Sequence, residues 1–186
     1  MTTPRPMRAD ARRNYERIVA TAREVFVEQG PEAPLDDIAR RAEVGAGTLY
    51  RHFPAREDLV AAVYSAAIQH NSNLAYQLLD EHDPWDALVL WMREQVHFGV
   101  QKRGLAATLK AAMDKDSATF AQCKSTLNEA AAAVLKAAQD AGVVRDDVKP
   151  RDLLLLGHGV AVATEATPED SERLLTITLD GLKPQR

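Results

Sequence analysis

The segment Ile38–Phe53, with the sequence IARRAEVGAGTLYRHF, constrains the fold of this chain more than any other. Its first five residues place three small or apolar side chains on one helical face and two arginines on the other. Val44 and Gly45 then interrupt the helix. We expect the valine to fill the angle between two helices and the glycine to adopt the backbone dihedrals of a tight turn. A second short helix follows over about residues 46–52, so the segment predicts a helix-turn-helix.

The second helix of this unit combines an apolar anchor with a polar outer surface. Leu49 and Phe53, spaced i, i+4, are expected to turn inward. The N-terminal positions are small enough to approach base edges, and the later positions carry hydroxyl or cationic groups suited to phosphates. The outer positions are Ala46, Gly47, Thr48, Tyr50, Arg51 and His52. This arrangement predicts a DNA recognition helix.

The run Val44–Leu59, with the sequence VGAGTLYRHFPAREDL, resembles the helix-turn-helix signature of the TetR family of bacterial transcriptional regulators. The apolar spacing, the TLY triplet and the continuation F-P-x-(K/R)-(E/D)-x-L occur together, and the likeness extends over about residues 12–64. The resemblance implies an all-α fold of about nine helices. Residues 1–55 would form a three-helix DNA-binding head, and residues 56–186 a helical body for ligand binding and dimerisation.

The resemblance also assigns roles by position. Base edges would be approached by Ala46, Gly47 and Thr48, phosphates would be bound by Tyr50, His52 and Arg56, and Arg51 could contact either. Two positions depart from the family pattern: Pro34 stands where a capping Ser or Thr is usual, and Ala46 lacks a polar side chain. Such a surface implies readout by thymine methyl contact, backbone approach and DNA shape, and leaves the bases open.

Charge is distributed unevenly along the chain. The net charge is -4, but residues 1–56 carry +2 and residues 57–186 carry -6. Local rather than overall charge governs attraction to phosphates. Residues 1–8, with two prolines and no apolar periodicity, are predicted to form a flexible arm. The arginines of this N-terminal region, Arg5, Arg8, Arg12 and Arg13, would lie in the minor groove or along phosphates, and the alternative of a solvated tail stays open.

Apolar periodicity predicts helices in nearly all of the remaining chain, and no segment alternates convincingly as a strand. The expected helices cover residues 9–29 up to Gly30, 56–82 with a bend left open at 70–73, 84–103, a short stretch after Gly104, 117–142, a stretch from Pro150, and 168–181.

The resemblance implies a small-molecule pocket in the body. The run Lys102–Ala106, with the sequence KRGLA, and the body that follows it resemble the SbtR-like subgroup. The expected lining is an apolar set with one amide: Trp91, Met92, Gln95, Phe98, Met113, Phe120, Cys123 and Leu127. Gln95 is the most informative member, because a buried amide needs a partner that an oxygenated ligand could supply. For each of these residues, ordinary core packing is the alternative.

The last two helices are apolar on more than one face, which exceeds what a single core requires. Gly157 and Ala161, four residues apart, would permit a close helix approach. By the family resemblance we expect these helices to form a four-helix homodimer interface through Leu153, Leu156, Gly157, Val160, Ala161, Leu174, Leu175 and Thr178. A two-fold dimer would read a palindrome in successive major grooves.

Other classes of protein find little support in the sequence. The single cysteine, Cys123, excludes an intrachain disulfide and fits a reducing cytoplasm. No apolar run approaches the roughly 18 residues of a membrane span, and the N-terminus is not a secretory signal. The five histidines lack metal-ligand spacing. We therefore expect no catalytic residue, metal or cofactor.

The functional prediction is a cytoplasmic, homodimeric repressor that binds a palindromic DNA operator and is released by an unknown small-molecule inducer. A transcriptional activator, or a regulator of the same fold without a ligand, is the alternative.

Overall fold

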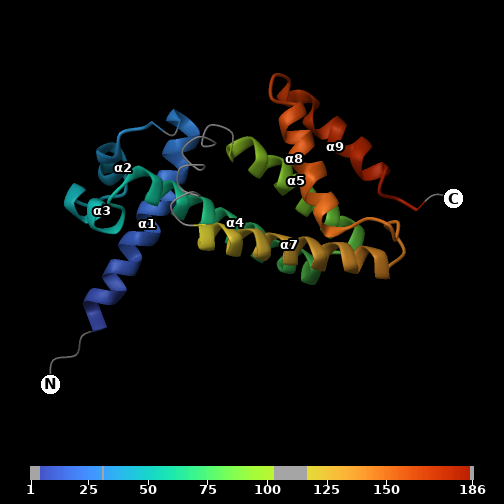
Figure 1. Ribbon diagram of the computed structural model, residues 1–186, viewed down its shortest axis with the longest axis horizontal. Helices are drawn as coiled ribbons and strands as arrows, with labels where there is room; N and C mark the ends of the chain where they lie inside the picture. The colour runs from blue at the N-terminus through green and yellow to red at the C-terminus, as the bar shows by residue number, and fades with distance from the viewer. Residues whose placement is uncertain (1–4, 31, 103–116, 185–186) are drawn as a thin grey trace. The chain divides into compact units, whose positions relative to one another are not determined.

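The computed structural model describes residues 5–30, 32–102 and 117–184. Within these residues there are eight α-helices and one 3₁₀ helix, η2, and no strand (Figure 1). Their bounds are α1 Arg5–Gln29, α2 Leu35–Arg41, α3 Ala46–His52, α4 Arg56–Glu81, α5 Pro84–Lys102, α7 Ser117–Asp140, α8 Pro150–Ala163, η2 Pro168–Asp170 and α9 Ser171–Asp180. The predicted all-α fold is confirmed. The helix expected after Gly104, and Met113 with it, lie outside the described residues.

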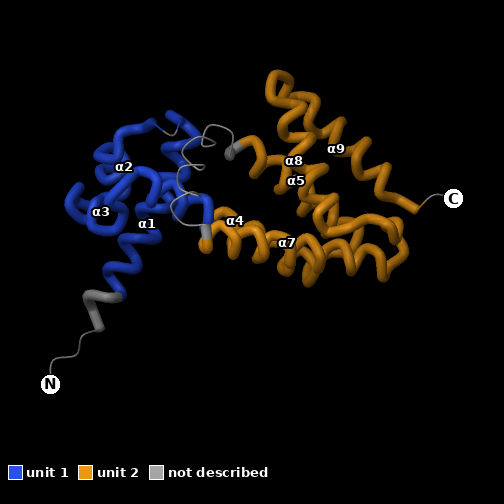
Figure 2. Tube along the Cα trace, viewed as in Figure 1, with its two compact units in different colours: residues 1–66, 104–117 blue, residues 67–103, 118–186 orange. Residues whose placement is uncertain are grey.

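The chain divides into two compact units (Figure 2). The first consists of residues 1–66 with 104–117, and the second of residues 67–103 with 118–186. The division falls within α4, which continues unbroken through residues 70–73, where the sequence left a bend open.

In the first unit, α1, α2 and α3 pack on one another in all three pairs. α1 begins at Arg5, four residues before the predicted start, so the expected arm of residues 1–8 is helical from residue 5. Pro6 does not prevent this, because it lies in the first turn, where the proline nitrogen needs no hydrogen. Fully buried side chains from α1 to α4 include Ile18, Ala22, Val25, Ile38, Leu49, Leu59 and Val60.

The turn between α2 and α3 differs from the sequence prediction. Glu43, not Gly45, adopts the left-handed conformation, with φ of 53°. The backbone N–H of Val44 donates to Ala39 (3.0 Å) and that of Glu43 to Arg40 (3.1 Å). This is the left-handed C-terminal cap that glycine usually closes. Gly45 is instead the N-cap residue of α3, with φ of -68°. It could close α2 in the left-handed conformation only if α2 ended two residues later than it does.

In the second unit, α5 and α8 cross closely (Figure 1). A Cβ on Gly99 would lie 2.6 Å from the Cβ of Ala161, and one on Gly157 would lie 2.8 Å from the Cβ of Gln95. Both glycines are therefore required by packing within the chain. The core around this crossing includes Leu88, Trp91, Met92, Ala131, Val134, Leu153 and Leu175.

This crossing corrects part of the predicted dimer interface. Five of the residues assigned to it are buried in the chain's own core, namely Leu153, Gly157, Val160, Ala161 and Leu175. The small residues of α8 do permit a close helix approach, but the helix that approaches them is α5 of the same chain. Leu156 is exposed, and Leu174 and Thr178 are half-buried.

Replacing Glu43 by glycine should raise the free energy of unfolding by about 1 kcal/mol. A residue with a Cβ loses roughly 1–2 kcal/mol in the left-handed region, and glycine's greater freedom in the unfolded chain offsets part of the gain. Urea unfolding measures the change. Glu24→Gly, at an exposed position inside α1, is the matched control and should lower stability by about 1 kcal/mol. Similar losses in both variants would contradict the assigned turn.

Candidate nucleic-acid interface and ligand site

α3 is anchored by one face and presents the other outward. Leu49 is completely buried and Phe53 nearly so, whereas Tyr50 is 45% exposed. The other predicted DNA contacts lie on the outer surface or at its edge: Ala46, Gly47 and Arg51 are exposed, and Thr48 and His52 are half-buried. A seven-residue helix is not stable alone, so burial of its two anchors holds this surface in place.

Arg51 lies back along α3 rather than extending freely. Its Nε donates to the carbonyl of Gly47 at 2.9 Å, and its Nη2 donates to the hydroxyl of Thr48 at 3.1 Å. The guanidinium and the hydroxyl therefore form one polar unit on the outward face. Two residues predicted separately as DNA contacts are held together by this hydrogen bond.

His52 belongs to an aromatic group at the end of α3. The Tyr15 ring of α1 lies 6.0 Å from the His52 ring, edge-on, and 5.1 Å from that of Phe53. Burial raises the pKa of the Tyr15 hydroxyl above its usual range. Sequence reasoning missed Tyr15. It is 40% exposed and lies three residues before Ile18 and seven before Ala22, and this helical spacing could have placed it at the edge of the buried face of α1.

The predicted phosphate-binding arginines already have partners within the chain. Arg56 is half-buried and donates from Nη1 to the carbonyl of Ala33 at 2.8 Å, just before α2 begins. Pro34 is the N-cap residue of α2 and gives no side-chain hydrogen bond. Arg12 pairs with Glu16 at 3.5 Å, and Arg13 pairs with Asp10. The pairs of Arg12 and Arg13 are exposed and weak, so a phosphate can replace the carboxylate in them.

The residues predicted to line a ligand pocket lie inside the second unit, apart from Met113, which is outside the described residues. Trp91 and Met92 are fully buried, Phe98, Phe120 and Cys123 are buried, and Leu127 is half-buried. Trp91, Met92 and Leu127 belong to one continuous core. Packing accounts for these three, whereas Gln95 has a polar environment of its own.

Gln95 and Asn71 form a buried amide pair. Gln95 is 5% exposed and donates from Nε2 to Oδ1 of Asn71, which is 1% exposed. The indole N–H of Trp91 donates to the backbone carbonyl of Asn71 at 3.1 Å. Nδ2 of Asn71 has no hydrogen-bond partner within the described part of the chain. The pair therefore leaves one buried donor unsatisfied, which costs free energy in a protein interior.

Sequence reasoning expected a polar partner for Gln95 but did not identify Asn71. The signal was present. In α4, Asn71 falls at helical spacing between Ile68 and Ala75, both of which are buried. A polar residue on the inward face of a helix is a candidate for a specific hydrogen bond.

The last two helices keep an outward apolar face, formed by Leu155, Leu156, Val162 and Ile177, which are 54%, 36%, 49% and 58% exposed. Three of these four were not in the predicted interface. A Cβ added to Gly159, between Leu155 and Val162, would meet nothing within 4 Å. The chain's own core thus leaves this side of α8 uncovered.

The described residues offer little for other chemistry. They hold no group of three or more His, Cys, Asp or Glu side chains placed to bind a metal ion. Nor do they contain a helix that is both long and apolar enough to cross a membrane.

Comparison with known proteins decides the family. Residues 18–63 match the family described as bacterial regulatory proteins, tetR family, and residues 83–184 match the C-terminal domain described as transcriptional regulator SbtR-like. The chain belongs to the TetR family of bacterial transcriptional regulators. Proteins of this family regulate transcription and are not enzymes. The expected likeness of the body to the SbtR-like subgroup is confirmed.

Solved structures agree over nearly the whole of this TetR-family chain. It is similar to the TetR regulator SCO0520 from Streptomyces coelicolor, with 34% identity and a TM-score of 0.81, over 92% of this chain and 99% of that one. A TetR regulatory protein from Mycobacterium vanbaalenii shows 33% identity and a TM-score of 0.74, over 96% of this chain and all of that one.

Curated relatives match a shorter part of the TetR-family chain. The HTH-type transcriptional regulator TtgW from Pseudomonas putida is 41% identical over 91 residues, which is 48% of this chain and 67% of TtgW. Among the other curated relatives, the match spans 42% of the length of one and 60% of the length of another.

The buried amide pair should behave as a coupled unit in a double-mutant cycle. Asn71→Leu and Gln95→Met each leave one buried amide without its partner, which costs about 1–3 kcal/mol. The double variant removes both, so it should lose less stability than the two single losses combined. Urea unfolding of the four proteins measures the coupling.

The exposed pair Gln69–Asn73 on α4 is the matched control, because it has the same hydrogen bond, at 2.9 Å, in solvent. Gln69→Met and Asn73→Leu should show almost no coupling. Additive losses at Asn71 and Gln95 would reject the assigned pair.

Proposed function

We propose that this regulator is a ligand-responsive repressor, which binds a palindromic operator as a homodimer and is released by a small-molecule inducer. The observation that carries the proposal is the outward face of α3, where small residues precede the Arg51–Thr48 unit and Tyr50. In this scheme residues 1–55 bind DNA, residues 56–186 bind ligand and partner, and the protein acts in the cytoplasm.

The proposed DNA contacts divide into two kinds. Ala46, Gly47 and Thr48 approach base edges, with Arg51 beside Thr48. Phosphates are bound by Tyr50, His52, Arg56, Arg12 and Arg13. Contacts to phosphate position the protein and supply salt-dependent affinity, whereas contacts to bases supply specificity. The net charge of +2 over residues 1–56 supports this division, because it contrasts with -6 in the remainder.

The proposed dimer uses the outward apolar face, in place of the five core residues named earlier. Side chains such as Leu155 and Ile177 are more than half exposed, and a contiguous exposed apolar surface often marks a protein interface. A two-fold dimer places two recognition helices in adjacent major grooves, about 34–36 Å apart.

The proposed response to ligand is supported by the Asn71–Gln95 pair. The unsatisfied Nδ2 of Asn71 is a buried donor suited to an oxygen or nitrogen acceptor of a bound molecule. A ligand shifts operator affinity only by as much as it prefers one conformation of the protein over another.

The proposal is tested by gel shift with the intergenic DNA upstream of the protein's own gene. Retardation at low salt, and its loss on addition of an inducer found by thermal-shift screening, is the expected result. Failure to retard any palindrome at low salt would reject DNA binding. Retardation that no compound of a broad library relieves would favour a ligand-independent regulator.

The double variant Arg12→Ala/Arg13→Ala should weaken binding about equally for operator and unrelated DNA. Each lost phosphate contact should reduce the slope of log K against log salt concentration by about 1. Titrations at several salt concentrations measure the slope. Arg173→Ala, an exposed arginine of α9 paired with Asp170, is the control and should leave the slope unchanged. An unaltered slope in the double variant would exclude the two arginines as phosphate contacts.

Val162→Glu should convert the dimer to monomers at micromolar concentration, because an isolated carboxylate in an apolar interface is costly. Sedimentation equilibrium measures the mass. Val27→Glu is the matched control, since Val27 of α1 is 60% exposed and lies far along the chain from α8. A Val162→Glu protein that remains dimeric would place the interface elsewhere.

A further inference from the structure

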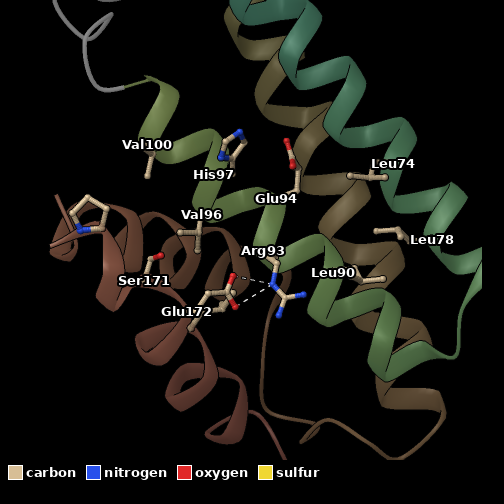
Figure 3. A pocket seen from close by; sticks show the side chains of 12 residues that line it. Leu74, Leu78, Leu90, Arg93, Glu94, Val96, His97, Val100, Ser171 and Glu172 are labelled. Carbon is tan, nitrogen blue, oxygen red and sulfur yellow. Dashed lines mark hydrogen bonds and ion pairs between the residues drawn. The ribbon is translucent and has the colours of Figure 1, made fainter. Parts of the chain in front are cut away.

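A groove of about 540 Å³ runs across the exposed side of α5, bordered by α4 and α9 (Figure 3). Its walls are mainly aliphatic, formed by Leu74, Leu78, Leu90, Val96, Val100 and Leu175. The volume falls within the roughly 300–1,000 Å³ typical of small-molecule sites. Among the described residues, none of those predicted to line a ligand pocket borders this groove, and neither does Asn71, so the groove is separate from the Asn71–Gln95 pair.

The charged side chains of the groove differ in whether an opposite charge pairs with them. Nε of Arg93 donates to both carboxylate oxygens of Glu172, at 3.0 and 3.2 Å, and this ion pair joins α5 to α9 (Figure 3). Glu94, one residue further along α5, is half-buried, and Figure 3 shows its carboxylate between His97 and Leu74, which also line the groove. No ion pair or hydrogen bond to Glu94 occurs among the described residues. As far as the described residues form it, the groove therefore has one carboxylate without a partner, set beside His97 and mainly aliphatic walls.

That carboxylate determines which ligand the groove favours. Covering Glu94 with a neutral apolar molecule would remove water from an unpaired charge, which is unfavourable. An anion would add repulsion from Glu94, since Arg93 is already paired. An organic cation would compensate the charge while its apolar body covers the leucines and valines. The net charge of -6 over residues 57–186 adds a general attraction for cations.

The groove also stays accessible in the proposed dimer. Ser171, Glu172 and Leu175 face it from α9. At about 100° per residue, Ile177 lies roughly half a turn away from these three around α9. A partner bound over Ile177 therefore contacts the opposite side of the helix.

We propose that the α5 groove binds a lipophilic organic cation, whose charge lies beside the Glu94 carboxylate. The binding site is inferred from the groove alone. Only the further step, that such a cation is the inducer, rests on the proposed function. Because charge compensation selects the ligand, the groove discriminates against neutral and anionic molecules of the same shape.

Isothermal titration calorimetry on the full chain tests the proposal with two ions of nearly equal shape. Tetraphenylphosphonium should bind at one site per protomer, at least about tenfold more tightly than tetraphenylborate. Glu94→Gln should weaken tetraphenylphosphonium binding about tenfold and leave the thermal midpoint unchanged. Glu129→Gln, on the exposed side of α7, is the matched control and should retain full affinity.

Val100→Arg tests the location of the site. Val100 is 43% exposed, so the arginine is accommodated without loss of the fold, and it adds bulk and positive charge to the groove. Tetraphenylphosphonium binding should be lost. Equal affinity for the two ions, or unchanged affinity in either Glu94→Gln or Val100→Arg, would overturn the proposal.

Gel shift in the presence of tetraphenylphosphonium separates this proposal from the proposed function. Binding that depends on Glu94 but leaves the DNA complex intact would support the groove and count against a cationic inducer. Release of operator by another compound, with no tetraphenylphosphonium binding, would reject the groove and support the ligand-responsive repressor.

Discussion

The burial of Leu49 and Phe53 is the interaction on which the DNA-binding surface depends. α3 has seven residues, and neither it nor α2 has a side-chain hydrogen bond at its N-cap. Helices of this length gain too little from backbone hydrogen bonds to persist alone. The two anchors hold α3 against α1 and α2, so the orientation of every outward residue follows from core packing. Recognition of DNA by this protein thus begins in the interior of its first unit.

The sequence predicted the elements of the fold because its local signals agree with one another. Gly30 follows the end of α1 in a left-handed conformation, with φ of 82°, as its position predicted. Pro150 is the first residue of α8, again as expected. Pro168 opens a short 3₁₀ turn rather than α9 itself, which starts at Ser171. Helix boundaries with a glycine or proline were therefore predictable to within a few residues.

The sequence could not show which partner each helix face meets. Gly157 and Ala161 signal a close approach, but the signal is the same whether the other helix belongs to the same chain or to a second copy. Only the structure shows that α5 fills that place. Similarly, the left-handed residue of the turn depends on where α2 ends, and composition favoured Gly45 over Glu43. Asn71 was missed because the polar run at residues 70–73 was interpreted as a place where the helix could bend, and not as part of a continuous helix with an inward face.

The contact between Arg51 and Thr48 has a consequence for the thermodynamics of recognition. Both side chains already have hydrogen bonds in the free protein, so the proposed operator contacts would exchange these bonds rather than add to them. Such an exchange contributes little to the strength of binding, but an incorrect base that offers no replacement leaves a donor or acceptor unsatisfied. In the proposed complex, the outer face of α3 would therefore penalise incorrect sequences, while the charges around it would supply the general affinity for DNA.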